Sequence, residues 1–298
     1  MEHVATLIAA PDSRDLTADL ADRAAAALAS AGAETAAPDW LAPGEACDLA
    51  FGGLDRSAAA AALQAALDGA PLDIGILAAE GRRKRLLVAD MESTIIAEEM
   101  LDEMAERLGL AARIAPITAR AMAGELDFTE ALEARVGLLA GQPAGLLDEV
   151  ARGITLNPGA RTLVRTMRAA GAVTALVSGG FTHFTALVRE ACGFDRDQAN
   201  RLAVEDGRLT GGLEPPILDR AAKRTALESL AAERSLPLSA ACAVGDGAND
   251  LDLLQAAGLG VGYRPKAVLR AAADVALDHG DLTALLYLQG YRKAKFKN

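Results

Sequence analysis

The sequence predicts an α/β protein: a Rossmann-like parallel sheet with helices on both faces, an inserted helical segment, and a small α+β domain in front. Three observations predict this fold class. From residue 86 onward, short apolar strands alternate with helices, which is typical of a parallel sheet. Residues 97–155 have long helical periodicity and no good strand, so they interrupt this alternation. Residues 1–80 show a separate strand-helix-strand-helix-strand pattern of ordinary domain size.

The N-terminal pattern alternates strands with Ala-rich helices. Strands are expected at 3–10, 48–51 and 72–78, and helices at 17–30 and 56–67. This region contains no cluster of residue types that are typical of catalysis. The basic run GRRKR at 81–85 follows. Because the rest of the chain is acidic, we interpret this run as a solvated linker edge rather than an anion-binding segment.

The second region repeats strand-helix units. Its expected strands lie at 86–89, 173–177, 202–205, 208–213, 241–244 and 260–262, and its helices at 160–170, 182–192, 221–233 and 250–257. Asp206-Gly207 predicts a hairpin between two of these strands. These boundaries divide the chain into a domain 1–80 and a domain 81–298, the latter with a core at 81–96 and 156–298 and a helical cap at 97–155.

Composition and charge exclude several classes of protein. The 298 residues carry 30 basic and 41 acidic side chains, a net charge of −11. This balance argues against a nucleic-acid partner, since such binding relies on clustered Lys and Arg. No apolar stretch suits a membrane span and no signal peptide is evident, so we expect no membrane partner and a cytoplasmic location. The three cysteines show no CxxC spacing and fit a reducing compartment. The sequence is compatible with a homodimer and does not determine the oligomeric state.

Three polar residues, Asp90, Ser178 and Asp246, each follow an apolar strand directly. In a parallel sheet the carboxyl ends of the strands meet at one edge, and ligands bind there. Any one of these residues alone is better interpreted as a helix N-cap. Three at the same topological position favour a functional site.

Further carboxylates accompany these strand ends, because Glu92 and Asp250 lie close in sequence to Asp90 and Asp246. Like charges at short range cannot all ionise without compensation. A hard divalent cation provides that compensation, and a set of oxygen ligands suits Mg²⁺. The sequence therefore predicts a magnesium site that would polarise a bound phosphate.

Other residues could hold the phosphate itself. The backbone amides of Gly179 and Gly180 can approach an anion closely, because no side chain obstructs them. Lys223 alone would be read as a surface lysine, but beside the other groups it becomes a counter-charge for a phosphate. The absence of a GxxxxGK[ST] pattern excludes a Walker-type nucleotide site.

Four ordered segments carry a family resemblance: DMEST at 90–94, SGG at 178–180, Lys223, and GDGAND at 245–250. They resemble the motifs of the haloacid dehalogenase superfamily of phosphatases. Two further stretches, MAGELDFTEALEARV and LVSGGFTHF, resemble the phosphoserine phosphatase branch of that superfamily. The resemblance covers about residues 86–280 and is specific, because order, spacing and cap agree. Some members carry an ACT-like N-terminal domain, and this is the expectation for residues 1–80.

The resemblance implies a role for each motif residue. Asp90 would attack phosphorus and form an aspartyl phosphate. Mg²⁺ would be held by the Asp90 carboxylate, the Glu92 backbone carbonyl and Asp246, with Asp250 orienting the metal site. The phosphoryl oxygens would be held by Ser178, Gly179, Gly180 and Lys223, and Asn249 would contact the substrate or orient Lys223.

Glu92 departs from the family pattern, which has a second Asp at this position. Glu retains the carboxyl group and a similar intrinsic pKa, but one added methylene changes its reach. We therefore expect Glu92 to be the general acid that protonates the leaving alkoxide and the base that then activates water.

The cap would select the substrate, which the resemblance implies to be O-phospho-L-serine. Glu99 would meet its ammonium group, and Arg135 would bind its carboxylate with two hydrogen bonds. Phe128 and Met122 would close an apolar lid over it. Without the family resemblance, Arg135 would be read as a partner in a surface ion pair, and Phe128 and Met122 as core residues.

The expected function is Mg²⁺-dependent hydrolysis of phosphoserine, the last step of serine biosynthesis. One alternative is a phosphatase or phosphotransferase for another small phosphomonoester, such as phosphohomoserine. A second alternative is a catalytically silent sensor that binds an amino acid through residues 1–80. The intact Asp90, Asp246 and Lys223 argue against the sensor, because a protein that only binds need not retain them.

Overall fold

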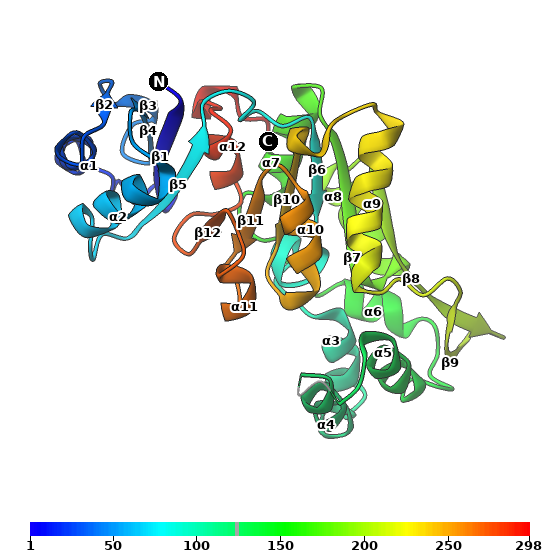
Figure 1. Ribbon diagram of the computed structural model, residues 1–298. Coiled ribbons are helices and arrows are strands. Elements are labelled where there is room, and N and C mark those ends of the chain that lie inside the picture. Colours follow the sequence, from blue (N-terminus) through cyan, green and yellow to red (C-terminus); the bar gives the residue numbers. More distant parts are fainter. Residues whose placement is uncertain (123–124) are drawn as a thin grey trace.

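The computed structural model describes residues 1–122 and 125–298 and contains two β-sheets. An N-terminal sheet with two helices lies beside a larger sheet that is flanked by helices, and a group of helices extends from one end of the larger sheet (Figure 1). The predicted fold class, an α/β protein with an inserted helical segment, is confirmed.

The N-terminal domain is a βαββαβ unit with one additional short strand. Its elements are β1 (His3–Ala9), α1 (Ala18–Ser30), β2 (Glu34–Thr35), β3 (Asp39–Ala42), β4 (Ala46–Gly52), α2 (Arg56–Ala66) and β5 (Leu72–Ala78). The sheet order is β2-β4-β1-β5, with β3 on β4, and every pairing is antiparallel. This is the split βαβ pattern. The ACT-like character of this domain stays a prediction, and β2 and β3 were not predicted.

Local sequence explains the two N-terminal helices. Thr17 accepts a hydrogen bond from Leu20 N (3.3 Å) and Asp55 accepts one from Ala58 N (2.9 Å), so each helix begins at a side-chain cap. The helices bury small and branched side chains against the sheet, and this apolar cluster includes Ala21, Ala24, Leu28, Ala59 and Leu63.

The larger sheet has seven strands in the order β12-β11-β10-β6-β7-β8-β9. They are β6 (Leu86–Ala89), β7 (Val173–Phe181), β8 (Arg196–Glu205), β9 (Arg208–Glu214), β10 (Ala241–Gly245), β11 (Gly260–Tyr263) and β12 (Val275–Leu277). All neighbours are parallel except β8 and β9, which form the predicted hairpin. β12 was not predicted, and β7 extends four residues beyond the predicted strand.

Helices cover both faces of this sheet. They are α7 (Ala160–Ala169), α8 (Thr182–Cys192), α9 (Arg220–Glu233), α10 (Leu251–Ala256), α11 (Ala267–Arg270) and α12 (Ala284–Leu288). Along the central strand β6, Leu87 and Ala89 pack into the cluster that contains α7 and α8, whereas Leu86 and Val88 pack into the cluster that contains α9 and α10. This alternation makes β6 apolar on both faces, as expected for a buried parallel strand.

The cap consists of α3 (Met100–Arg107), α4 (Ala111–Met122), α5 (Phe128–Gly137) and α6 (Leu146–Ala151). The described residues between 97 and 155 contain no strand longer than an isolated bridge, as the sequence predicts. Asp127 and Glu130 form a reciprocal capping box that begins α5. The cap lies at the end of the sheet from which the β8-β9 hairpin projects (Figure 1).

Buried polar contacts dock the N-terminal domain onto the larger domain. Asp73 of β5 is 4% exposed and accepts hydrogen bonds from three consecutive backbone amides, those of Asp278, His279 and Gly280, at 2.7 to 3.3 Å. Arg82 donates to both carboxylate oxygens of Asp48 at 2.6 and 3.0 Å. The prediction that 81–85 is a solvated linker is therefore wrong for Arg82, because its partner is a buried carboxylate on the other sheet.

Candidate active site

Asp90, Ser178 and Asp246 lie at one edge of the large sheet, because β10, β6 and β7 are neighbours there. Asp90 and Asp246 directly follow β6 and β10, and Ser178 lies near the end of β7. Their exposed fractions are 3%, 1% and 6% for Asp90, Ser178 and Asp246. The sequence argument that these residues converge is therefore consistent with the structure.

A buried lysine links two of the carboxylates. Lys223 of α9 is 3% exposed, and its Nζ lies 2.6 Å from Asp90 Oδ1 and 2.6 Å from Asp250 Oδ1. Burial opposes the charge of Lys223, but Asp250 and Asp90 outweigh burial and raise its pKa. Burial and the nearby Asp250 raise the pKa of Asp90 well above its usual value, and Lys223 acts in the opposite direction. The lysine is therefore a fixed positive charge directly beside Asp90.

The loop after β10 is organised by Asp250, which is fully buried. Its Oδ2 accepts hydrogen bonds from the amides of Asp246 and Gly247, both at 3.2 Å. A Cβ at Gly245 would lie 2.3 Å from Asp250 Cγ, so only glycine fits beside this carboxylate. Asp250 thus positions both the loop and Lys223.

Three buried carboxylates could hold a metal ion. One oxygen each of Asp90, Asp246 and Asp250 lies within 4.8 Å of the others. All three groups are hydrogen-bond acceptors when ionised, and hard divalent cations prefer such oxygen ligands. The described residues near them supply only two lysine charges, Lys223 and Lys266. The donor set therefore fits a divalent cation.

Lys266 was not predicted from the sequence. Its Nζ lies 3.0 Å from Asp246 Oδ2, and its backbone amide donates to the Asp246 carbonyl at 2.8 Å. The preceding Arg264 adopts a left-handed conformation, with φ of 44°. The available signal was a basic residue shortly after strand 260–262, at the same sheet edge as the other site residues.

Glu92 faces Ser178 and the second glycine of the SGG motif. Ser178 Oγ lies 3.3 Å from Glu92 Oε2 and accepts a hydrogen bond from Gly180 N at 2.9 Å. A Cβ at Gly180 would lie 2.7 Å from Glu92 Oε2, so any larger residue there would displace the Glu92 carboxylate. Burial, followed by the Glu99 carboxylate, raises the pKa of Glu92 to about 7. Glu92 can therefore gain or lose a proton near neutral pH.

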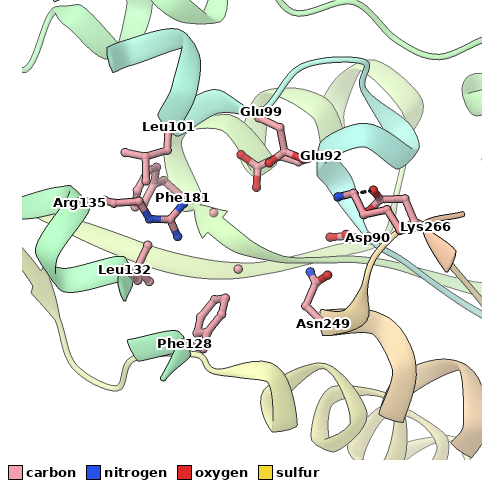
Figure 2. Close-up of a pocket in the computed structure, with 13 residues that line it drawn as sticks. Asp90, Glu92, Glu99, Leu101, Phe128, Leu132, Arg135, Phe181, Asn249 and Lys266 are labelled. Carbon is pink, nitrogen blue, oxygen red and sulfur yellow. Dashed lines mark ion pairs between the residues drawn. The ribbon is translucent and has the colours of Figure 1, made fainter. Parts of the chain in front are cut away.

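The site opens into a cavity of about 160 Å³ between the core and the cap. This is smaller than the ~300 Å³ at which drug-sized pockets begin, so the cavity suits a small molecule. Arg135 points into it from the side opposite Asp90, with Phe128 and Leu132 nearby (Figure 2). The complete lining is Asp90, Glu92, Glu99, Leu101, Phe128, Leu132, Arg135, Gly179, Gly180, Phe181, Asp246, Asn249 and Lys266.

The predicted cap residues have different surroundings. Arg135 donates to the Ala131 carbonyl at 3.1 Å, and among the described residues no carboxylate forms an ion pair with it. Glu99 accepts a hydrogen bond from Ser93 Oγ at 2.8 Å. A Cβ at Gly179 would lie 2.9 Å from Phe128 Cζ, so Phe128 packs on the SGG motif. The side chain of Met122 lies outside the described part of the chain.

Other predicted residues lie behind the cavity wall or beside it. Ser178, Lys223 and Asp250 are buried behind the residues that line the cavity, whereas Asn249 lines it. Lys223 Nζ forms ion pairs with Asp90 and Asp250, and among the described residues no hydrogen bond joins it to Asn249. Sequence reasoning missed Leu101, Leu132 and Phe181, because their apolar side chains cannot be distinguished from core residues by type alone.

The part of the chain that carries this site matches a known sequence family. The family described as haloacid dehalogenase-like hydrolase matches residues 87–255. The chain therefore belongs to the haloacid dehalogenase-like hydrolases, and the predicted family resemblance is confirmed. Among the described residues, no helix is both long and apolar enough to cross a membrane.

Several curated relatives are similar to this chain over most of its length. A phosphoserine phosphatase from Streptomyces coelicolor is 44% identical over 250 residues, which make up 83% of this chain and 61% of that protein. The chain spans 53% to 61% of the length of the first curated relatives that it matches.

Solved structures show the same fold. A HAD family hydrolase from Salmonella enterica has a TM-score of 0.83 and 28% identity, covering 96% of this chain and 98% of that one. A structure described as a phospho-aspartyl intermediate analogue of phosphoserine phosphatase has a TM-score of 0.64 and 36% identity. It covers 68% of this chain and 98% of its own.

Proposed function

We propose that the protein hydrolyses O-phospho-L-serine to L-serine and phosphate with Mg²⁺ as cofactor, the last step of serine biosynthesis. One observation carries this proposal: Asp90, with Lys223 beside it, lines a small cavity that Arg135 enters from the opposite side. The names of the relatives support the choice of substrate.

The reaction has two steps at Asp90. An Asp90 oxygen attacks phosphorus and forms an aspartyl phosphate, and the departing serine oxygen takes a proton from Glu92. Glu92, now ionised, takes a proton from water, which attacks the phosphorus and returns Asp90 to its carboxylate form. A pKa of about 7 suits Glu92 to both proton transfers.

Positioning and charge lower the barrier for both steps. Lys223 holds Asp90 in place, and the amides of Gly179 and Gly180, which line the cavity, contact the phosphoryl oxygens, with Ser178 directly behind them. The carboxylates of Asp90 and Asp246 and the backbone carbonyl of Glu92 would hold Mg²⁺, with Asp250 behind them. When bound, such an ion would neutralise charge on the phosphoryl group.

The cap recognises the rest of the substrate. Arg135 binds the serine carboxylate, and its guanidinium is available because no acid of the described chain pairs with it. Glu99 meets the ammonium group, Asn249 contacts the phosphoryl end, and Phe128 excludes water.

The test is phosphate release from phosphoserine, phosphohomoserine, phosphothreonine and p-nitrophenyl phosphate, each with Mg²⁺ and with EDTA. We expect phosphoserine to be hydrolysed most efficiently, and only with metal. Faster turnover of phosphohomoserine, or phosphoryl transfer to added homoserine, would replace phosphoserine with that substrate. Metal-independent turnover would contradict the proposal.

A further inference from the structure

Two chain segments connect the cap to the core, and they lie side by side. One follows the catalytic Asp90 loop and the other precedes α7. Ile96 and Leu156 form an antiparallel bridge, and Ala97 N donates to the Thr155 carbonyl at 3.0 Å. Any movement of the cap relative to the core must bend this pair of segments.

The side chain of Asn157 helps to fasten the two segments together. Its Nδ2 donates to the carbonyl of Thr94 at 2.8 Å and to that of Ile96 at 3.0 Å. Its backbone amide donates to the carbonyl of Ile95 at 2.9 Å. Asn157 thus binds three consecutive carbonyl oxygens, and both amide hydrogens of its side chain are used. Two carbonyl acceptors also define the orientation of the amide group, since its own oxygen would be repelled.

The bound segment is the exit of a strained loop. Ser93, between Glu92 and Thr94, has a φ of 53°, a left-handed conformation that is unfavourable for a residue other than glycine. Such conformations persist only where the surrounding structure enforces them. At the entrance of the loop, Asp90 N donates to the Val244 carbonyl at 3.0 Å. At the exit, the corresponding anchor is Asn157.

We propose that Asn157 is a positioning residue that fixes the loop carrying Asp90 and Glu92, and thereby sets the place of both carboxylates in the reaction. The proposal rests on the proposed function for the roles of those two residues. Asn157 does not line the cavity, so it acts through the loop and not on the substrate. A side chain with two donors on one nitrogen is required, because two separate carbonyls must be bound.

Asn157→Asp tests this directly, because it keeps the shape of the side chain and replaces both donors with acceptors facing carbonyls. We expect kcat to fall about 10- to 100-fold, since misplacing a reacting group by about 1 Å can cost 10²-fold. The loss should be equal for phosphoserine and p-nitrophenyl phosphate, and KM should stay within about twofold. Asn157→Ala, which removes the donors without adding repulsion, should show a smaller loss of the same kind.

Gln289→Glu is the matched control. Gln289 is 1% exposed, and its Nε2 donates to the Leu285 carbonyl at 2.9 Å, so the same amide-to-carboxylate change occurs far from the site. Both variants should unfold at a lower temperature, but only the change at Asn157 should lower kcat. An equal fall in kcat for Gln289→Glu would overturn the proposal, because general destabilisation would then explain both.

Amide hydrogen exchange supplies a measurement that needs no turnover. The amides of Ile96 and Ala97 should exchange faster in Asn157→Asp than in wild type, and should be unchanged in Gln289→Glu. If wild type hydrolyses none of the phosphomonoesters, the proposed function fails, while exchange still tests whether Asn157 holds the loop. Unchanged exchange together with unchanged kcat in both Asn157 variants would refute the positioning role.

Discussion

Two groups of buried carboxylates can be compared in this molecule, one between the domains and one in the candidate active site. Glu45, Asp48 and Asp73 at the domain interface are 4% to 7% exposed. Asp90, Asp246 and Asp250 in the site are 0% to 6% exposed. Burial therefore does not distinguish the two groups.

Their spacing does distinguish them. At the interface each acid has its own donors: three backbone amides for Asp73, Arg82 and Thr6 for Asp48, and Tyr287 and Lys293 for Glu45. The site acids also accept hydrogen bonds, Asp90 from the Met91 amide and Asp250 from two amides, but the three acids lie within 4.8 Å of one another and share two lysines. A separate acid with its own donors stabilises the fold, whereas crowded acids repel one another and retain affinity for a cation.

The largest expected effect separates activity from stability at Asp90. Asp90→Asn removes the nucleophile, so phosphate release should fall by at least about 10³-fold. The melting temperature should not fall, because burial and Asp250 already disfavour the ionised form. Thermal unfolding and single-turnover assays on the same preparation would check both. If Asp90→Asn lost much stability but no turnover, the site carboxylates would behave like those of the interface, and the comparison would fail.

The second effect, at the domain interface, is a loss of stability without a loss of activity. Asp73→Ala removes the acceptor of three consecutive backbone amides, those of residues 278–280, of which that of Gly280 is buried. The free energy of unfolding should fall by about 3 kcal/mol, since hydrogen bonds to a charged group are among the stronger ones. Activity at low temperature should stay within about twofold of wild type. Urea denaturation would measure the loss, and Ser13→Ala, an exposed position on the same domain, would be the control.

The third effect concerns substrate binding in the site and leaves the reacting groups unchanged. Arg135→Ala should raise KM for phosphoserine about 10-fold or more, because a charged hydrogen-bond partner of the substrate carboxylate is lost. KM for p-nitrophenyl phosphate, which has no carboxylate, should barely change. Equal changes for both substrates would show that Arg135 does not read the carboxylate. Arg107→Ala, on the exposed surface of the cap, would serve as the control.

The smallest effect concerns an exposed ion pair. Hydrogen bonding to Arg270 lowers the pKa of Asp278, and both side chains are more than 40% exposed. Because the pKa of Asp278 is lower in the folded state, ionised Asp278 stabilises the fold at pH values above about 3.9, its pKa in the unfolded chain. This contribution is lost as the pH falls from there through the lower pKa of the folded state. Asp278→Asn should cost less than about 1 kcal/mol at pH 7 and nothing near pH 2. Denaturation curves at the two pH values would check this, and a loss of several kcal/mol would mean that exposure alone does not weaken such pairs.

Much of the fold could be predicted because its signals are local. The alternation of strands and helices after residue 86 and the helical periodicity of 97–155 both correspond to the observed elements. β2, β3 and β12 were missed, because they have two to four residues and none has an uninterrupted run of four apolar residues like that of β6. β2 and β3 pair with β4, and β12 pairs with β11, so these short strands depend on pairing for their formation.

The candidate site was partly predictable for the same reason. Asp90 and Asp246 directly follow apolar strands, and strand ends converge in any parallel sheet. Lys266 and Asn157 carry no such signal. Lys266 reaches Asp246 after a strained turn, and the partners of Asn157 are more than 60 residues away in sequence.

The amino-acid sequence by itself determined where strands, helices and chemically capable residues occur, because side-chain periodicity and strand-end position are properties of neighbouring residues. Only the tertiary structure decided which buried acids lie apart and which crowd together. Arg82 illustrates this, since it reads as part of a solvated basic run and yet binds a buried carboxylate of the other sheet. The physical reason is that electrostatic energy depends on distances in space and on the surrounding solvent, and residue spacing along the chain specifies neither.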